Sequence, residues 1–326
     1  MKKNVRSIIL IMVIMTLFFT SCNTVRYTST KVQTLVPPAR IINLPDTANI
    51  AIVATLHDKT EEEEVAESSL DSLTITNVAM SIKTNMEASP KYRSYIFPVY
   101  TVNAGENGLT KEQVLDIKES SNANYLISVE DFKSEAFKKR IRTSFENCIR
   151  IVVPHSSTIK IYDVDKLTII DEHMIQDTLS LQVNADPWET EDELVQRLPD
   201  TKTAVLLVVK EMAKSYVEDI APFWKEETRY YYLDSHIERA KIYIDNEEWS
   251  KAMNIWMLYV DDANKALAAI SCFNMALGCE MLGEYDLALK WIDNVKRKNE
   301  AYYWEEYKKL LNRRIAEKAI LDRIIK

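Results

Sequence analysis

The spacing of apolar residues changes period several times along the chain. Residues 50–54 form a short apolar run, typical of a buried strand, and apolar residues recur at helical spacing across 75–86. Two more strands are expected at 95–102 and 125–129, with a helix between them that opens at a capping box on Thr110. This β-α-β-α-β order predicts a mostly parallel sheet.

The pattern that follows is typical of antiparallel strands. Residues 149–153 and the alternating run 158–163 predict two strands, with a loop at 155–157 between them. A turn then leads to apolar residues 167–170, and a further strand is expected around 174–181. A hairpin or meander therefore joins the parallel strands, and the sheet is predicted to be mixed.

Two helices are expected at 189–197 and 201–220, and the second is apolar enough to pack on the sheet. Trp224 and the tyrosines at 230–232 should cover a junction between domains. Residues 45–227 are thus predicted to form an α/β (α+β) module. Its order of elements resembles the small modules of envelope lipoproteins related to the curli secretion channel and to the Tol-system propeller protein.

The C-terminal third contains an internal repeat. Trp249 and Tyr285 are 36 residues apart, as are Ala252 and Ala288. Small residues at such positions let two antiparallel helices approach closely, and the large ones fill the space between them. The pattern resembles the tetratricopeptide repeat (TPR), which implies an all-α domain at 228–326, with copies at about 233–268 and 269–302 and a capping helix at about 301–325.

The TPR resemblance also implies a binding surface. First-helix residues of such repeats line a concave groove, which suits an extended peptide or a helix of a partner protein. Trp249, Ala252, Tyr285 and Ala288 are expected to pack inside the repeats. By alignment, the groove-lining residues are Ile237, Lys241, Ile244, Phe273, Leu277 and Glu280.

The N-terminus has the features of a secretion signal. Three basic residues precede a run of 12 almost wholly apolar residues at 8–19, which is too short to span a membrane. The sequence Phe19-Thr20-Ser21-Cys22 resembles the lipobox of bacterial lipoproteins, although Phe19 replaces the usual leucine. The resemblance implies cleavage after residue 21, lipidation of Cys22, and a Ser-, Thr- and Pro-containing tether at 22–44.

The net charge and the residue after the cysteine indicate how and where the protein is held at the membrane. Removing the three basic residues of the signal changes the formal net charge from −8 to 38 − 49 = −11, so acyl chains on Cys22 would hold the protein at the membrane. Asn23, in place of an aspartate, favours the outer membrane, and the lack of a following acidic cluster favours its periplasmic face. Most of the mature chain resembles uncharacterised lipoprotein families of Gram-negative gut-type bacteria.

Composition excludes several chemistries. The acidic net charge argues against a nucleic-acid partner. Only four glycines occur where average usage would give about 23, and no two form a phosphate-binding loop, so no nucleotide or other cofactor is expected. The four histidines form no metal-ligand pair, and the cysteines at 148, 272 and 279 are interpreted as buried apolar residues.

Two remaining charged segments, the acidic run 61–64 and the basic residues at 138–142, are interpreted as solvated loops. The chain is therefore expected to be a non-enzymatic scaffold that binds an envelope protein through its helical domain. The alternative is a periplasmic hydrolase or glycan-binding lipoprotein whose site carries no local motif.

Overall fold

A computed structural model describes residues 26–42, 44–45, 48–57, 68–92, 95–104, 108–143, 146–186, 188–298 and 304–325. The expected signal peptide, Cys22 and the acidic run 61–64 lie outside this part of the chain. None of the described helices is both long and apolar enough to cross a membrane. The chain divides into two compact units, Leu35–Trp224 with Leu321–Lys326, and Met1–Thr34 with Lys225–Ile320.

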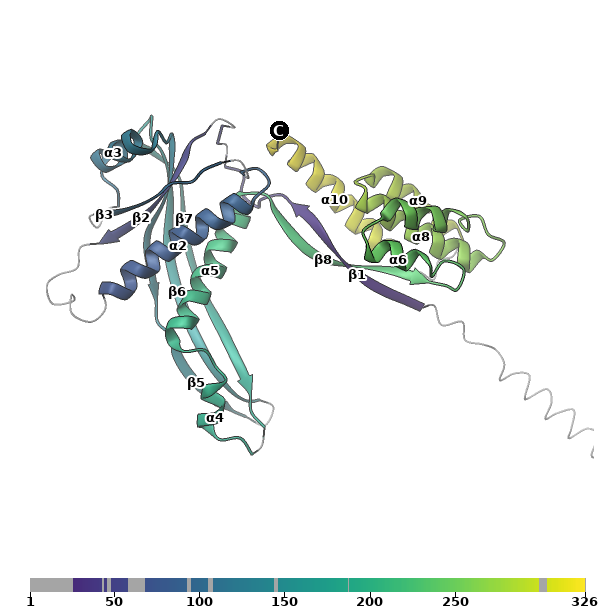
Figure 1. Ribbon diagram of the computed structural model, residues 1–326, viewed down its shortest axis with the longest axis horizontal. Helices are drawn as coiled ribbons and strands as arrows, with labels where there is room; N and C mark the ends of the chain where they lie inside the picture. The colour runs from purple at the N-terminus through teal and green to yellow at the C-terminus, as the bar shows by residue number, and fades with distance from the viewer. Residues whose placement is uncertain are drawn as a thin grey trace, which may run out of the picture. The chain divides into compact units, whose positions relative to one another are not determined.

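The first unit is built on a six-stranded mixed sheet, as predicted (Figure 1). The second strand of the chain pairs in parallel with the third and fourth, and the remaining pairings are antiparallel. The order is β3-β2-β4-β6-β5, and β7 pairs with β6. The strands are β2 (Ile50–His57), β3 (Val99–Ala104), β4 (Tyr125–Ser134), β5 (Phe137–Arg142), β6 (Asn147–Asp163) and β7 (Thr168–Asn184).

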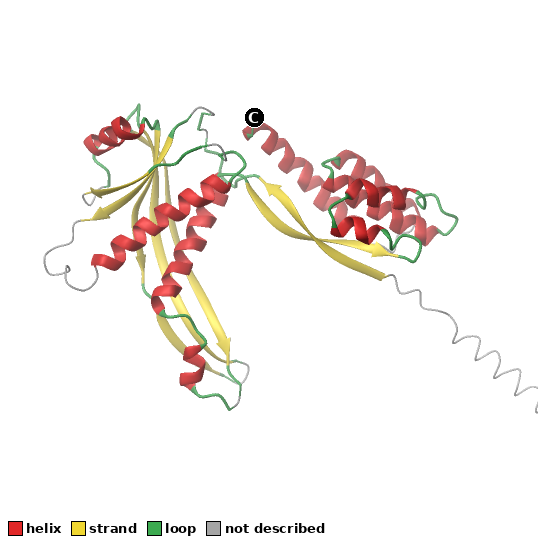
Figure 2. Cartoon of the chain, viewed as in Figure 1, coloured by secondary structure: helices red, strands yellow, loops and turns green. Residues whose placement is uncertain are grey.

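Helices cover the two faces of this sheet unequally (Figure 2). On one face, α2 (Ser68–Ala88) and α5 (Thr201–Ile220) pack against each other and enclose the main core with β2, β4 and β6. On the other face, α3 (Lys111–Ser121) buries a smaller cluster, and its predicted capping box at Thr110 is confirmed. The short α4 (Glu191–Gln196) precedes α5. Much of β6 and β7 therefore has a helix layer on one side only.

The long strand β6 differs from the prediction. It continues through 155–157, where a loop was expected. Pro154 does not interrupt the strand, because no backbone N–H is needed at this position for hydrogen bonds between strands. The Pro154 carbonyl accepts from the backbone N–H of Glu135 at 3.4 Å, so its backbone faces the break between β4 and β5. The basic residues at 138–142 were also assigned wrongly, because they form β5 and pair with β6.

The second unit is mostly helical. It contains α6 (Ala240–Asp245), α7 (Trp249–Met257), α8 (Lys265–Met281), α9 (Tyr285–Lys298) and α10 (Trp304–Ile324). Helix α8 packs against both α7 and α9 and is buried from Leu267 to Glu280. At Gly278 a Cβ atom would lie 2.4 Å from Cγ of Met253, so glycine permits the close approach of α7. The described cysteines are free and buried as expected, and burial raises the pKa of Cys272 and Cys279 to about 11.

Part of the segment predicted as a tether is a strand. Residues of β1 (Arg26–Val36) pair with β8 (Phe223–Leu233) to form a two-stranded sheet, called the ribbon below. Val32 and Thr34 of β1 are buried. In the first unit, Arg40 contacts Asp219 and donates to both carboxylate oxygens of Asp171 at 3.1 Å.

Candidate functional site

The groove predicted on the helical unit is not formed by the predicted residues. Ile237, Ile244, Phe273, Leu277 and Glu280 are each 6% exposed or less. Only Lys241 lies on the surface, where its ammonium contacts Asp245 at 2.6 Å. The other five were assigned wrongly. Phe273, Leu277 and Glu280 lie on α8, which is enclosed by its neighbours along this stretch, and Ile237 and Ile244, before and on α6, are buried in the core of the same unit.

Glu280 instead belongs to a buried cluster of hydrogen-bonded side chains. Its carboxylate accepts hydrogen bonds from Nε and Nη2 of Arg229 at 2.8–3.1 Å and from the hydroxyl of Tyr307 at 2.5 Å. Burial lowers the pKa of Arg229, but hydrogen bonds and charges from Glu280 and Glu227 outweigh it and raise the pKa overall. This cluster fixes β8 on α8, and its atoms are not accessible to a partner.

The residues predicted to pack inside the repeats lie at helix contacts. Ala252 and Ala288 are fully buried, on α7 and α9. Trp249 and Tyr285 are half-buried and pack against the same core. The hydroxyl of Tyr285 also accepts from Nη2 of Arg314 on α10 at 3.4 Å. These four residues hold helices together and present no site.

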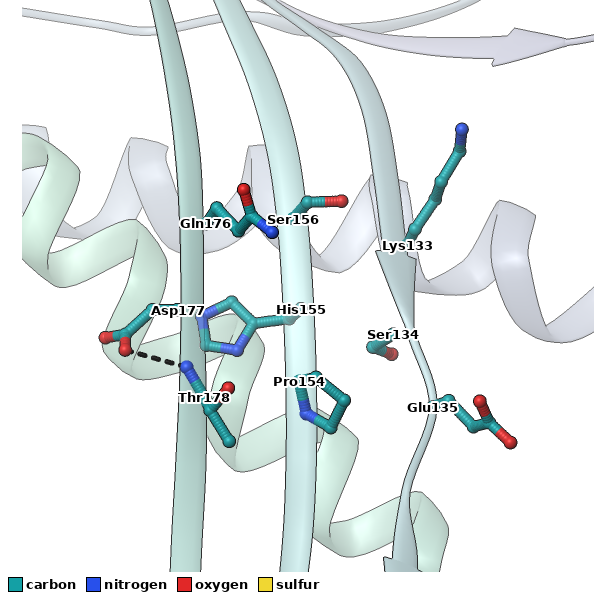
Figure 3. Close-up of a pocket in the computed structure, with 9 residues that line it drawn as sticks. All are labelled: Lys133, Ser134, Glu135, Pro154, His155, Ser156, Gln176, Asp177 and Thr178. Atoms are coloured by element: carbon teal, nitrogen blue, oxygen red, sulfur yellow. Dashed lines mark hydrogen bonds between the residues drawn. The ribbon is translucent and has the colours of Figure 1, made fainter.

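A polar cavity of about 600 Å³ lies on the sheet of the first unit, where β4, β6 and β7 run side by side (Figure 3). Two rows of directly opposed residues cross these strands. Sequence reasoning missed the cavity because its residues come from three separate segments and share no motif. It is lined by Lys133, Ser134, Glu135, Pro154, His155, Ser156, Gln176, Asp177 and Thr178.

His155 is the most buried titratable group in this cavity, with 9% of its surface exposed. Its Nδ1 lies 3.2 Å from the carbonyl oxygen of Val153. A carbonyl can only accept, so Nδ1 is assigned as the donor, and in the neutral ring Nε2 then carries the lone pair. His155 can therefore accept a hydrogen bond from a ligand hydroxyl without changing its tautomer.

Strand register places Ser134, His155 and Asp177 at directly opposed positions on three adjacent strands. Such residues act as a catalytic triad only when the carboxylate holds the imidazole and the imidazole holds the hydroxyl. Here the Asp177 carboxylate points away from the imidazole and accepts from the backbone N–H of Thr178 at 2.7 Å (Figure 3). Because Nδ1 of His155 bonds to a backbone carbonyl, the arrangement suits recognition better than nucleophilic attack.

The same Asp177 contact protects the edge of the sheet. Thr178 lies opposite Pro154, whose backbone faces the other way, so the Thr178 N–H faces the free edge of β7. The Asp177 carboxylate satisfies this donor and puts a negative charge where another strand could add.

Other possible sites are less developed. A second cavity of about 690 Å³, lined in part by Asn49, Tyr95 and Asn122, lies at the amino ends of β2 and β3. Ligands of open α/β sheets bind at the opposite, carboxyl ends. Within the described ranges, no group of three or more His, Cys, Asp or Glu side chains is arranged to hold a metal ion.

The molecule is thus defined as a two-unit protein with a mixed-sheet α/β unit and a helical unit. The chain belongs to the family defined by a domain of unknown function (DUF8603), whose model matches residues 50–232, more than half of its length. A second domain of unknown function (DUF6340) matches residues 238–314. No curated protein matches the chain in sequence.

Several solved structures match part of the chain. A minor lipoprotein from Acinetobacter baumannii is 8% identical with a TM-score of 0.27, over 56% of this chain and 100% of that one. A homologue of the putative neuraminyllactose-binding hemagglutinin from Helicobacter pylori is 11% identical with a TM-score of 0.31, over 52% and 84%. A hypothetical protein from Chlamydia trachomatis is 11% identical with a TM-score of 0.20, over 51% and 98%. At these scores, the similarities establish neither a shared fold nor a shared function.

Proposed function

We propose that this protein is a lipid-anchored, non-enzymatic scaffold of the Gram-negative envelope, held on the periplasmic face of the outer membrane. The observation that carries the proposal is the basic start, short apolar run and small residue before Cys22. The structure adds that β1 begins at Arg26, four residues after that cysteine. A signal peptide ending at residue 21 would therefore leave both described units whole.

The anchor is tested by Cys22→Ala in the full-length chain, expressed in a Gram-negative host with a labelled fatty acid. Wild type should incorporate the label and fractionate with the outer membrane, and the variant should do neither. Cys279→Ala is the matched control, because that thiol is buried in α8 and should not affect labelling. Equal membrane recovery of the Cys22→Ala variant would overturn the lipid anchor.

We further propose that the helical unit is TPR-like and contacts a protein partner. Buried Ala252 and Ala288 at the contacts of successive helices support the repeat. The predicted groove residues are replaced in this proposal by exposed apolar side chains, which are candidates for contact with another protein. These are Ile242, Met257, Leu258, Leu282 and Leu287, with exposures between 42% and 76%.

The partner surface is tested by crosslinking in intact cells with Ile242→Glu and Leu258→Glu, each compared with Lys241→Glu. Loss of one defined crosslinked species in an apolar-to-Glu variant, with the Lys241→Glu pattern unchanged, supports the surface. Retention of every crosslinked species in both apolar variants contradicts it.

A second candidate function is the binding of a polyhydroxylated glycan in the cavity of the first unit. The observation that favours it is the row of polar side chains at directly opposed positions of β4, β6 and β7, namely Lys133, Ser156 and Gln176, which share one face of the sheet. Binding of envelope glycan fragments should weaken in Gln176→Ala and remain unchanged in Gln182→Ala, which lies on the same strand outside the cavity. Turnover of a glycan that is lost in Ser134→Ala would instead establish the hydrolase alternative.

A further inference from the structure

The ribbon has one buried face and one exposed face. Along β1, Val32 and Thr34 are buried, whereas Tyr27, Ser29 and Lys31 are exposed. The two strands are antiparallel, because the contact between Tyr27 and Tyr230 is followed by an ion pair between Lys31 and Glu226 at 2.7 Å. In β8, Arg229 points inward to α8, and Tyr230 and Glu226 are exposed.

The exposed face carries aromatic residues at its two ends and charged residues between them. At the end where β1 starts, the rings of Tyr27 and Tyr230 meet edge to face with centroids 5.9 Å apart, although 64% and 58% of these residues remain exposed. Farther along the same face come Ser29 and then the ion pair of Lys31 with Glu226. Trp224, at the far end of the same face of β8, is also 56% exposed, so the Tyr27–Tyr230 pair is the aromatic surface at the end that is nearest in sequence to Cys22.

Chain length limits how far this aromatic pair can lie from an anchored Cys22. Tyr27 is five positions after Cys22, and a fully extended chain covers at most about 17 Å over five positions. Tyrosine rings are enriched at membrane interfaces, where the ring contacts apolar groups and the hydroxyl meets water and headgroups.

We propose that the Tyr27–Tyr230 pair contacts the lipid headgroup region in which Cys22 is anchored. This inference rests on the proposed lipid anchor, to which it adds a second membrane contact. The occupant of the exposed aromatic surface is the bilayer surface itself. The pair orients the ribbon at the membrane, whereas the acyl chains supply most of the affinity.

The test uses full-length acylated protein reconstituted into vesicles of phosphatidylethanolamine and phosphatidylglycerol. A fluorescent label is placed on Ser29→Cys, with Gln33→Cys as the control farther along the same exposed face. The native cysteines at 148, 272 and 279 are buried and should not react in the folded protein. Lipids with a nitroxide at headgroup depth should quench the label at position 29 more than the label at position 33.

A double variant, Tyr27→Ser with Tyr230→Ser, should lose the quenching at position 29 and still float with the vesicles. The matched control is Lys31→Ser with Glu226→Ser on the same face, which should keep the quenching. Unchanged quenching in the tyrosine variant would overturn the inference. Wild type that floats with the vesicles but shows no quenching at position 29 would also overturn it. If shielding of the label depends on the density of protein on the vesicles and not on the quencher lipid, the exposed surface contacts a second copy of the protein and the inference fails. Wild type that fails to float would instead contradict the lipid anchor itself.

Discussion

Glu280 on α8 accepts three hydrogen bonds from a single guanidinium, that of Arg229 on β8, at 2.8–3.1 Å. Both residues are less than 5% exposed, and 51 positions separate them in sequence. A buried ion pair is costly to desolvate, and removing one partner leaves an uncompensated buried charge. The pair therefore ties the position of β8 to the integrity of the helical unit.

We predict that Glu280→Gln destabilises the helical unit by roughly 3 kcal/mol, because the amide keeps the shape of the side chain and removes its charge. Urea unfolding followed by circular dichroism measures the change. Asp245→Asn removes the exposed partner of Lys241 and should have a much smaller effect, because solvent screens that pair. Equal effects of the two substitutions would show that Arg229 does not depend on Glu280.

Alkaline pH should destabilise the helical unit through Tyr307. Burial, and then the charge and hydrogen bond of Glu280, raise the pKa of this tyrosine well above its usual value of about 10. The folded state thus keeps a proton that the unfolded chain releases. The stabilisation is complete below about pH 10, and the free energy of unfolding decreases as the pH rises above it.

The measurement is the urea midpoint as a function of pH from about 9 upward. Tyr307→Phe should make the decrease shallower than in wild type. Tyr230→Phe, at an exposed position of the ribbon, should leave the slope unchanged. A Tyr307→Phe profile parallel to that of wild type would contradict this assignment.

Ala288 should not tolerate a larger side chain. It is fully buried on α9, which packs against α8, so Ala288→Leu should overpack the contact and cost roughly 1–3 kcal/mol. Thermal unfolding of the purified protein measures the loss. Leu287→Ala changes the adjacent, 42% exposed residue and should leave the melting temperature nearly unchanged. An unchanged melting temperature in Ala288→Leu would mean that the two helices are not closely packed there.

Strand β1 should be part of the folded protein and not a dispensable linker. A soluble chain that begins at residue 37 loses the pairing with β8 and the buried side chains of Val32 and Thr34. Burial of a valine alone is worth roughly 2 kcal/mol, so this chain should be less stable than one that begins at residue 23. Lys31→Ala with Gln33→Ala in the longer chain is the control for the exposed face. Equal melting of the two chains would restore the tether interpretation.

Local patterns were sufficient for much of the first unit. The capping box at Thr110, the apolar helix at 201–220 and the mixed sheet depend on residues near one another in sequence, and each was predicted from them. The buried Ala252 and Ala288 also followed from spacing, because a repeat places equivalent helix contacts at a fixed interval. The long strand β6 was missed because Pro154 signals a break unless its neighbours are known.

The sequence by itself determined most of the helices, the parallel strands of the sheet and where small residues lie between helices. Tertiary structure decided which surfaces remain open. Between Leu267 and Glu280, α8 carries a single charged residue, and such a helix is buried on all sides only if enough neighbours surround it. The pairing of β1 with β8 and the ion pair of Arg229 with Glu280 join distant segments. The polar cavity on β4, β6 and β7 likewise depends on strand register, which no single segment encodes.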